Sequence, residues 1–347
     1  MSISDVRDEI DYEISTILAT DFDIEVTPTS NVPHSDDPAI TFPNFDLRFQ
    51  RSKLIKTAVL YVDIRRSTNL NLDHREPTVA KLYSAFVRAM TRCAAEYGGH
   101  VRGIIGDRVM VLFDPSTAFT DAVDTATLMN SVCQHELNKY FKQDDVTCGI
   151  GIDYGRMLAT KTGVRRHGYE RPNYRALVWL GRPANVASKL TDLANKTTHY
   201  SRDIVREARV ATVGIGSLGN VLGAFAPGGA GFGGLGNALS PFGLDQAMGG
   251  GWIWEDVELK EFVGRLTYDP ATSTITHRDP SFRSFYLTTK ERTTSTPPIL
   301  MTKAVYEGFR KANPQRDSVQ RGLWKPVSLF VPGYNGGIFG GGVIFSK

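Results

Sequence analysis

Cysteine is scarce in this sequence, which contains only Cys93, Cys133 and Cys148 among 347 residues. An odd number with no C-x-x-C pair argues against a disulfide framework and a structural zinc site, and it favours a reducing compartment. Histidine is scarce as well. The seven histidines form no H-x-x-x-H or H-E-x-x-H pattern, so the sequence gives zinc chemistry no support.

A strong excess of charge is also lacking. Forty basic and 37 acidic residues leave a formal net charge of +3, too small to indicate a nucleic-acid-binding protein, and we expect no nucleic-acid partner. The N-terminal stretch MSISDVRDEIDYEIST is acidic and polar, unlike a secretory signal. We therefore expect a cytoplasmic location.

One long stretch has no charged side chain at all. Residues 210–244 contain no Asp, Glu, Lys or Arg and are numerous enough to span a bilayer. However, residues 211–251 hold 14 glycines in 41 positions, and Pro227 and Pro241 interrupt the apolar run. This composition favours a flexible insertion over a membrane-spanning helix.

The rest of the chain alternates between strand and helix patterns. Residues 57–64 form an apolar, β-branched run typical of a buried strand, and apolar residues at helical spacing follow Pro77. Short strands are then predicted on both sides of a turn at Gly106-Asp107, and again over 146–152 and 156–161. This alternation predicts a layered α+β fold interrupted by the insertion.

The pattern also divides the chain. An N-terminal amphipathic helix is followed by an irregular, proline-containing arm, and the core pattern then runs until the glycine-rich stretch begins. We predict four parts: 1–50 (helix and arm), 51–200 (core), 201–296 (Gly-rich insertion) and 297–347 (completion of the core).

Two aspartates are the first candidates for chemistry. Asp63 lies at the end of the predicted strand 57–64, and Asp107 lies at the tip of a hairpin that could pair beside it. Two adjacent carboxylates are natural ligands for Mg²⁺ or Mn²⁺ and would help to neutralise a triphosphate. Either aspartate taken alone is better explained as a turn residue.

Phosphate-binding features lie nearby. Residues 64–70, with the sequence IRRSTNL, combine a strand end with hydroxyl side chains and a helix start, an arrangement that suits phosphate binding by backbone N–H groups. Between residues 156 and 190, eight basic residues accompany one acid, Glu170. A polyphosphate site explains this concentration of charge, and so does a solvated basic loop.

A helix predicted over 183–195 carries a further pair. Asn185 and Lys189 are four residues apart and therefore share one helix face. An amide and an ammonium directed at one point suit a developing phosphoryl charge. A simple helix-surface pair fits the same residues.

Together these motifs resemble the catalytic domain of class III nucleotidyl cyclases, the fold of adenylate and guanylate cyclases. The resemblance covers residues 57–195, and the ending from 299 is similar to the family's C-terminal part. The matching motifs are V-D-I at 62–64 with Ser67 and Thr68, G-G at 98–99, I-G-D at 105–107, G-I-D-Y-G at 151–155, and G-x-x-x-N-x-A-x-K-L at 181–190.

The resemblance implies a ferredoxin-like, palm-type fold with a mixed, mainly antiparallel sheet flanked by helices. It also implies a symmetric homodimer with both sites at the interface. Asp63, Asp107 and the backbone carbonyl of Ile64 would hold two Mn²⁺ or Mg²⁺ ions, while Asn185 orients the ribose and Lys189 stabilises the transition-state charge. The phosphates would be bound by Arg66, Ser67 and Thr68.

Departures from the family concern the base. Adenylate cyclases carry a base-reading lysine where this chain has Gly103, and an acidic or hydroxyl residue where it has Val178. Lys189 stands where the family usually has arginine, and lysine lacks the bidentate fork. The glutamate and cysteine typical of guanylate cyclases are also absent from these positions.

A pocket without purine-reading groups resembles the pyrimidine cyclases of bacterial anti-phage (Pycsar) systems, which make cyclic UMP or cyclic CMP. The resemblance implies UTP rather than CTP as substrate and a cyclic-nucleotide-responsive effector downstream. Tyr61 shares a strand face with Asp63 and could contact the base, although a core tyrosine fits equally well. Arg102 is a further base-contacting candidate.

Three alternatives remain at this stage. The chain could be an adenylate or guanylate cyclase, a non-catalytic cyclase-like nucleotide sensor, or a palm enzyme such as a polymerase or a diguanylate cyclase, although no GGDEF-type sequence is present. A G-x-G-x-x-G match at 214–219 lies in the glycine-rich tract without a following helix pattern, so it does not indicate a dinucleotide site.

Overall fold

The computed structural model describes all residues except 1, 68–73, 141–145, 164–174, 211–251 and 346–347. Contacts divide the chain into two units, each described by itself. Unit 1 comprises Met1–Thr197 and Ser295–Lys347, and unit 2 comprises Thr198–Thr294. Of the predicted Gly-rich insertion, 201–296, residues 211–251 lie outside the described residues. No helix in the described ranges is long and apolar enough to cross a membrane.

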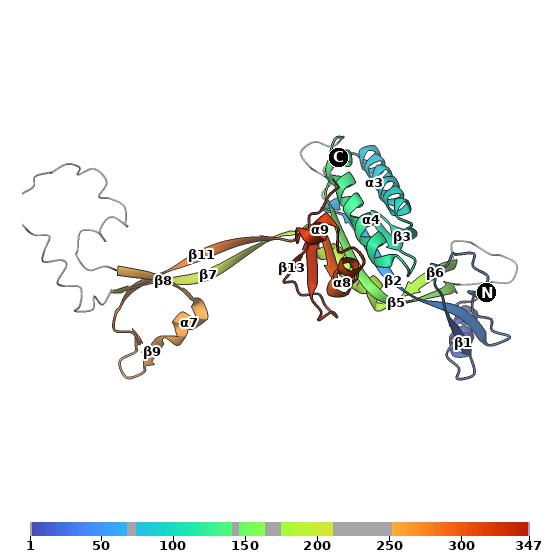
Figure 1. Cartoon of the computed structure of the whole chain (residues 1–347). Coiled ribbons are helices and arrows are strands. Elements are labelled where there is room, and N and C mark those ends of the chain that lie inside the picture. Colours follow the sequence, from blue (N-terminus) through green and yellow to red (C-terminus); the bar gives the residue numbers. More distant parts are fainter. Residues whose placement is uncertain (1, 68–73, 141–145, 164–174, 211–251, 346–347) are drawn as a thin grey trace, which may run out of the picture. The chain divides into compact units, whose positions relative to one another are not determined.

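In the described part of unit 1, nine strands form one sheet (Figure 1). Seven run in the order β13-β14-β12-β5-β2-β4-β3, while β1 pairs with β2 and β6 pairs with β5. The β1–β2 and β12–β5 pairs are parallel and the other pairs are antiparallel, so the predicted mixed, mainly antiparallel sheet is confirmed. The strands are β1 Asp23–Pro28, β2 Phe49–Ile64, β3 His100–Ile105, β4 Arg108–Leu112, β5 Cys148–Gly163, β6 Arg175–Leu180, β12 Ile299–Thr302, β13 Lys325–Val327 and β14 Ile338–Gly341.

The centre of this sheet has ferredoxin-like connectivity. The elements β2-α3-β3-β4-α4-β5 follow one another along the chain, and their strands lie in the order β5-β2-β4-β3. The predicted ferredoxin-like arrangement is therefore present. The helices of unit 1 are α1 Ile3–Ile17, α3 Glu76–Glu96, α4 Ala118–Val132, which a π-helix continues over Cys133–Leu137, α5 Arg182–Leu193, α8 Lys303–Ala312 and α9 Asp317–Gln320.

The alternation of side chains along β2 builds two hydrophobic layers. Leu60 and Val62 point into a core shared with α3, α4 and α8, whereas Ile55 and Val59 point into a second core shared with α5. Asp63 has the same parity as Val59, so it belongs to the α5 side of the sheet. This parity decides which helix can contact the candidate site.

Two strands predicted over 146–152 and 156–161 are one continuous strand, β5. The predicted gap between them includes Gly155, which serves close packing within the strand. A Cβ atom there would lie 2.9 Å from Cγ of Pro183, and one at Gly151 would lie 2.2 Å from the carbonyl oxygen of Ala187. The missing side chains let α5 lie directly on β5.

The arm predicted as irregular contains β1 and the first part of β2. Neither has a hydrophobic pattern: β1 has no buried residue, and the first buried residues of β2, Gln50 and Ser52, are polar. Gln50 is buried and its Nε2 donates to Thr160 Oγ1 at 2.9 Å and to the carbonyl of Lys161 at 2.8 Å. Buried polar side chains that have hydrogen-bond partners are tolerated inside a protein, but they do not produce the alternating apolar pattern by which a strand is predicted from sequence.

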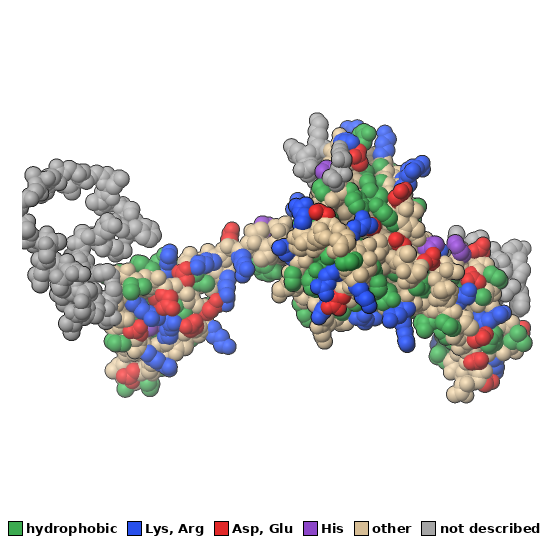
Figure 2. Space-filling model, viewed as in Figure 1, with side chains coloured by type: hydrophobic (Ala, Val, Ile, Leu, Met, Phe, Trp, Pro, Cys, Tyr) green, Lys and Arg blue, Asp and Glu red, His purple; other side chains and the backbone are tan. Residues whose placement is uncertain are grey.

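Unit 2 contains a three-stranded sheet in the order β11-β7-β8 and a β9–β10 hairpin. Its small core consists of Val205, Val257 and Phe262, with Leu266 and Phe282 packed against them. Figure 2 shows Lys and Arg side chains interspersed with Asp and Glu over this unit. The elements are β7 Thr197–Val210, β8 Trp252–Glu258, α7 Leu259–Gly264, β9 Leu266–Asp269, β10 Thr274–His277 and β11 Phe282–Ser295.

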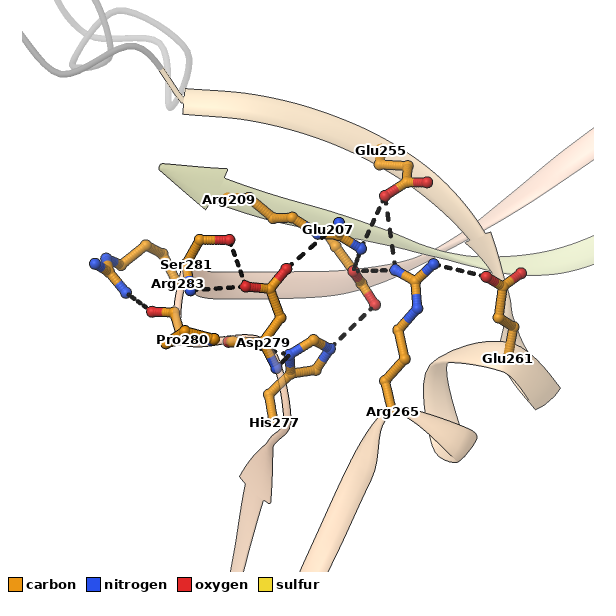
Figure 3. A network of polar contacts seen from close by, with 10 residues as sticks. All are labelled: Glu207, Arg209, Glu255, Glu261, Arg265, His277, Asp279, Pro280, Ser281 and Arg283. Atoms are coloured by element: carbon orange, nitrogen blue, oxygen red, sulfur yellow. Dashed lines mark hydrogen bonds and ion pairs between the residues drawn. The ribbon is translucent and has the colours of Figure 1, made fainter. Parts of the chain in front are cut away.

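A network of charges lies beside that core (Figure 3). The carboxylate of Glu207 is fully buried and accepts from Arg209 Nη2 at 3.0 Å and from Arg265 Nη1 at 2.8 Å. His277 Nε2 lies 3.5 Å from the other oxygen of Glu207. A buried carboxylate requires such partners, so the network is a structural requirement of unit 2.

We predict that Arg265→Gln destabilises unit 2 by about 2 kcal/mol, because it removes one of the two guanidinium groups on a buried carboxylate. Hydrogen exchange at the Val205 and Val257 amides measures the loss, with amides of unit 1 as an internal reference. Arg202→Gln is the matched control, since Arg202 pairs with Glu258 in an exposed position, where such a pair contributes less than about 1 kcal/mol. Equal effects of the two variants would contradict the prediction.

Candidate active site

The two candidate metal-binding aspartates lie together at one end of the sheet. Asp63 is the penultimate residue of β2, and Asp107 lies between Gly106, whose φ is 62°, and the start of β4. The turn at Gly106 needs the left-handed conformation that glycine adopts without strain. It brings the Asp107 carboxyl group within hydrogen-bonding distance of the Asp63 carboxyl group.

The environment of Asp107 is unfavourable for its charged form. Burial raises the pKa of Asp107 to about 6, and the neighbouring Asp63 carboxylate adds to the increase through its charge and through a hydrogen bond. The backbone N–H groups of Asp107 and Ile64 act in the opposite direction. In addition, Asp107 Oδ2 is buried and has no hydrogen-bond partner.

A buried, unpartnered oxygen beside a second carboxylate fits a hard divalent cation, which takes oxygen ligands and offsets the repulsion between the two acids. Among the described residues, no cluster of three or more His, Cys, Asp or Glu side chains is close enough to hold a metal. A metal at this site would therefore depend on the two aspartates together with backbone oxygen, such as the carbonyl of Ile64.

Arg108 is a site residue that the sequence analysis missed. Its Nη2 and Nε donate to Asp63 Oδ2 at 2.6 and 3.2 Å, and its Nη1 donates to Ser188 Oγ at 2.9 Å. Arg108 Nη2 also contacts the carboxylate of Asp192. A basic residue directly after a turn looks like a solvated surface residue in the sequence, and only the fold reveals that three partners surround it.

Arg65, directly after β2, forms hydrogen bonds with the backbone of α5. One guanidinium nitrogen of Arg65 donates to the carbonyl of Thr191, and a second lies 3.4 Å from the carbonyl of Asp192. A Cβ atom at Gly149 would lie 2.0 Å from this guanidinium group, so any larger residue there would force the Arg65 side chain to move. The end of β2 and the second half of α5 are thereby held together.

Asn185 and Lys189 both lie on α5 but do not reach the aspartates. Asn185 is exposed, and its side chain makes no hydrogen bond within the described part of the chain. Lys189 Nζ donates to the carbonyl of Pro332 at 2.8 Å. Within the described residues, no hydrogen bond or ion pair joins either side chain to Asp63 or Asp107, so one chain presents two separate halves of the expected site.

Of the four base-contacting candidates, Tyr61 of β2 and Gly103 of β3 lie on opposite sides of Met110, which belongs to the intervening strand β4. The Tyr61 hydroxyl lies 2.9 Å from Met110 Sδ, and a Cβ atom at Gly103 would lie 3.6 Å from Met110 Cβ, an ordinary contact. Burial raises the pKa of Tyr61. Its hydroxyl therefore stays protonated and able to donate.

Arg102 and Val178 do not join this group within one chain. Arg102 Nε donates to the carbonyl of Pro33 in the N-terminal arm at 3.0 Å. Val178 pairs with Thr160 of β5, whereas Tyr61 pairs with Gly151 of the same strand. A structural contact with the arm therefore accounts for Arg102.

The predicted phosphate-binding residues are only partly described. Arg66 is exposed with a φ of 57°, Ser67 is half-buried, and Thr68 lies outside the described residues. Part of the predicted basic cluster lies outside them as well. Of the others, Lys161 Nζ donates to the carbonyl of Asp37 at 2.7 Å, so it serves the N-terminal arm.

The chain matches no family model. It does match curated proteins. A uridylate cyclase from Burkholderia cepacia is 31% identical over 186 residues, covering 52% of this chain and 75% of the relative. A uridylate cyclase from Xanthomonas perforans is 30% identical over 192 residues, with the same coverage. A cytidylate cyclase from Staphylococcus aureus is 31% identical over 116 residues, covering 30% of this chain and 27% of that protein.

Solved structures are similar at a lower level. A class III adenylyl cyclase-like ATP-binding protein from Pseudomonas aeruginosa has a TM-score of 0.43 and 21% identity, covering 55% of this chain and 39% of that one. The adenylyl cyclase CyaB from P. aeruginosa has a TM-score of 0.36 and 19% identity, covering 44% of this chain and 86% of that one.

A relative that is 31% identical, and of which this chain covers three quarters, establishes the class: the chain belongs to the class III nucleotidyl cyclases. Within that class its curated relatives are named uridylate cyclase and, in one case, cytidylate cyclase. The resemblance inferred from the motifs is confirmed.

Proposed function

We propose that this enzyme converts UTP into 3′,5′-cyclic UMP and pyrophosphate. The observation that carries the proposal is the paired Asp63 and Asp107 carboxyls, of which Asp107 has a buried, unpartnered oxygen, in a chain whose relatives are named uridylate cyclase. In the reaction, the ribose 3′-hydroxyl attacks the α-phosphorus in line and the bond to pyrophosphate breaks.

Asp63, Asp107 and the Ile64 carbonyl are the groups that would hold two Mn²⁺ or Mg²⁺ ions. Such ions polarise the phosphoryl oxygens and neutralise charge on the leaving pyrophosphate. Asn185 of a second copy would orient the ribose, and its Lys189 would offset the negative charge that develops on the phosphoryl group. The exposure of Asn185 and its separation from the aspartates of its own chain support a homodimer in which each site takes one half from each subunit.

The neutral lining at Gly103 and Val178 supports a pyrimidine substrate. Neither residue can form the polar contacts that adenylate cyclases direct at adenine, and Tyr61 supplies a hydroxyl on the site face of β2. We propose that this hydroxyl donates to a carbonyl oxygen of uracil. The cyclic nucleotide would act as a second messenger for a cyclic-nucleotide-responsive effector, as in anti-phage defence.

The proposal is tested with the purified chain, Mn²⁺ or Mg²⁺, and ATP, GTP, CTP or UTP in separate reactions, with products identified by mass spectrometry. Cyclic UMP formed with pyrophosphate is the expected result. Cyclic CMP, AMP or GMP as the main product would overturn the base assignment while keeping the class. Nucleotide binding without any cyclic product would instead favour the non-catalytic sensor.

Tyr61→Phe is expected to lower kcat/KM for UTP about tenfold, because a base carbonyl loses its hydrogen-bond donor. Thermal stability should change little, since the hydroxyl contacts only the sulfur of Met110 in the described part of the chain. Tyr154→Phe is the matched control, because Tyr154 packs against the core on the α3, α4 and α8 side of the sheet. Equal losses in the two variants would refute a base contact by Tyr61.

A further inference from the structure

A positively charged side chain already contacts one of the two aspartates that we propose as metal ligands. Arg108 directs two N–H groups at the same oxygen, Asp63 Oδ2, at 2.6 and 3.2 Å. Both side chains are largely shielded, with 27% of Arg108 and 16% of Asp63 exposed. By contrast, Oδ2 of the neighbouring Asp107 has no partner. The two acids are therefore unequal: one is neutralised within the chain and the other is not.

We propose that the guanidinium group of Arg108 occupies the place of a metal ion at Asp63 in the metal-free site. A divalent metal must displace this group from Asp63 before it can bind there. This inference rests on the proposed function, since it assumes that Asp63 is a metal ligand. Arginine keeps its charge at every physiological pH, so it cannot leave by losing a proton. The guanidinium group and the metal therefore compete for the same carboxylate oxygen.

The partners of Arg108 on α5 provide its position after displacement. Ser188 Oγ accepts from Nη1, and the Asp192 carboxylate contacts Nη2. Asp192 is 55% exposed, so it can carry the ion pair at the protein surface without a buried charge being left alone. Arg108 can thus release Asp63 while keeping two of its three partners.

This exchange would also connect the metal site to the second half-site. Ser188 and Asp192 belong to the same helix as Asn185 and Lys189. In the metal-free chain, Arg108 holds that helix to Asp63, and after metal binding it would hold the helix through Asp192 and Ser188 only. Binding of the metal at Asp63 is therefore expected to alter the attachment of α5, the helix that serves the partner's site.

The experiment measures Mn²⁺ binding to the full chain without nucleotide, from the free-ion signal in electron paramagnetic resonance. Arg108→Gln is expected to bind Mn²⁺ about tenfold more tightly than the wild-type chain, in the range of typical coupling between two ligands. Arg108→Lys keeps the charge but cannot direct two N–H groups at one oxygen. Its Mn²⁺ affinity should therefore lie between those of the wild-type chain and Arg108→Gln. It also tests the proposal if Arg108→Gln does not fold.

Arg65→Gln is the matched control. Arg65 has the same charge and interacts electrostatically with Asp63, but its hydrogen bonds go to backbone carbonyls of α5. If Arg108 competes directly with the metal, Arg65→Gln should change the Mn²⁺ affinity by less than about twofold at 0.5 M salt, where long-range electrostatic interactions are screened but direct contacts persist. Equal tightening by Arg65→Gln and Arg108→Gln would overturn the proposal, and so would an Arg108→Gln affinity equal to that of the wild type.

Mn²⁺ binding by the wild-type chain and by Asp63→Asn tests the metal site separately from the competition by Arg108. If the wild-type chain binds Mn²⁺ and Asp63→Asn abolishes binding, the metal site stands, and the Arg108 variants then decide the competition alone. If none of the chains binds Mn²⁺, including Arg108→Gln, both the metal assignment and the proposal built on it are wrong.

Discussion

Asp63→Asn and Asp107→Asn are each expected to reduce cyclic-nucleotide formation by about a thousandfold or more, because a site that loses one of two carboxylates loses several kcal/mol of transition-state stabilisation. The measurement is turnover of UTP with saturating Mn²⁺. Asparagine has the shape of aspartate, so the packing at the end of β2 and in the β3–β4 turn is preserved.

The same two variants should change stability in opposite directions. Asp107→Asn removes a carboxylate whose charge is disfavoured by burial and by Asp63, so the metal-free chain should become more stable. The pKa of Asp107 is raised to about 6, which means that the wild-type chain loses stability as the pH rises through that value. The increase in stability caused by Asp107→Asn should therefore be present at pH 8 and largely absent at pH 4.

Asp63→Asn should instead destabilise the metal-free chain, because it removes the better shielded of the two carboxylates that Arg108 contacts and leaves the more exposed Asp192 as its charged partner. Thermal unfolding in the presence of a chelator separates the two cases. If both variants lost turnover and stability together, misfolding would explain the loss of activity. If either variant kept wild-type turnover, that residue would not be a metal ligand.

The parts of this protein that could be predicted from its sequence are those with regular hydrophobic patterns. The strand ending at Asp63 and the turn at Gly106 are both encoded within a few neighbouring residues, and so is the α5 helix that carries Asn185 and Lys189. Because each signal is local, the relative order of these elements along the chain was enough to suggest the fold.

Contacts between distant segments could not be predicted in the same way. Gln50 is buried in the first part of β2, and its hydrogen-bond partners Thr160 and Lys161 are more than 100 residues away along the sequence. Arg108 lies between Asp63, which precedes it by 45 residues, and Ser188, which follows it by 80. A single residue type gives no indication of such partners, since their distances are set by sheet register and helix packing.

Mixing two inactive variants should restore activity if each site is shared between two copies of the chain. In a heterodimer of Asp63→Asn and Lys189→Ala chains, one site combines the intact aspartates of the second chain with the intact α5 of the first, and the other site carries both defects. Equal, random association makes half of the dimers mixed, each with one working site, so about a quarter of the wild-type activity is expected.

The matched control mixes Asp63→Asn with Asp107→Asn. Both substitutions lie in the same half of the site, so every dimer has two damaged aspartate pairs and no activity should return. Coexpression of differently tagged chains, followed by purification through both tags, isolates the mixed dimers. Because each of these has one working site of two, about half of the wild-type activity is then expected. Recovery in the first mixture alone would establish the shared site. Equal inactivity of both mixtures would mean that Lys189 acts on the aspartates of its own chain, and α5 would then have to move, because Lys189 Nζ is held at 2.8 Å from the carbonyl of Pro332.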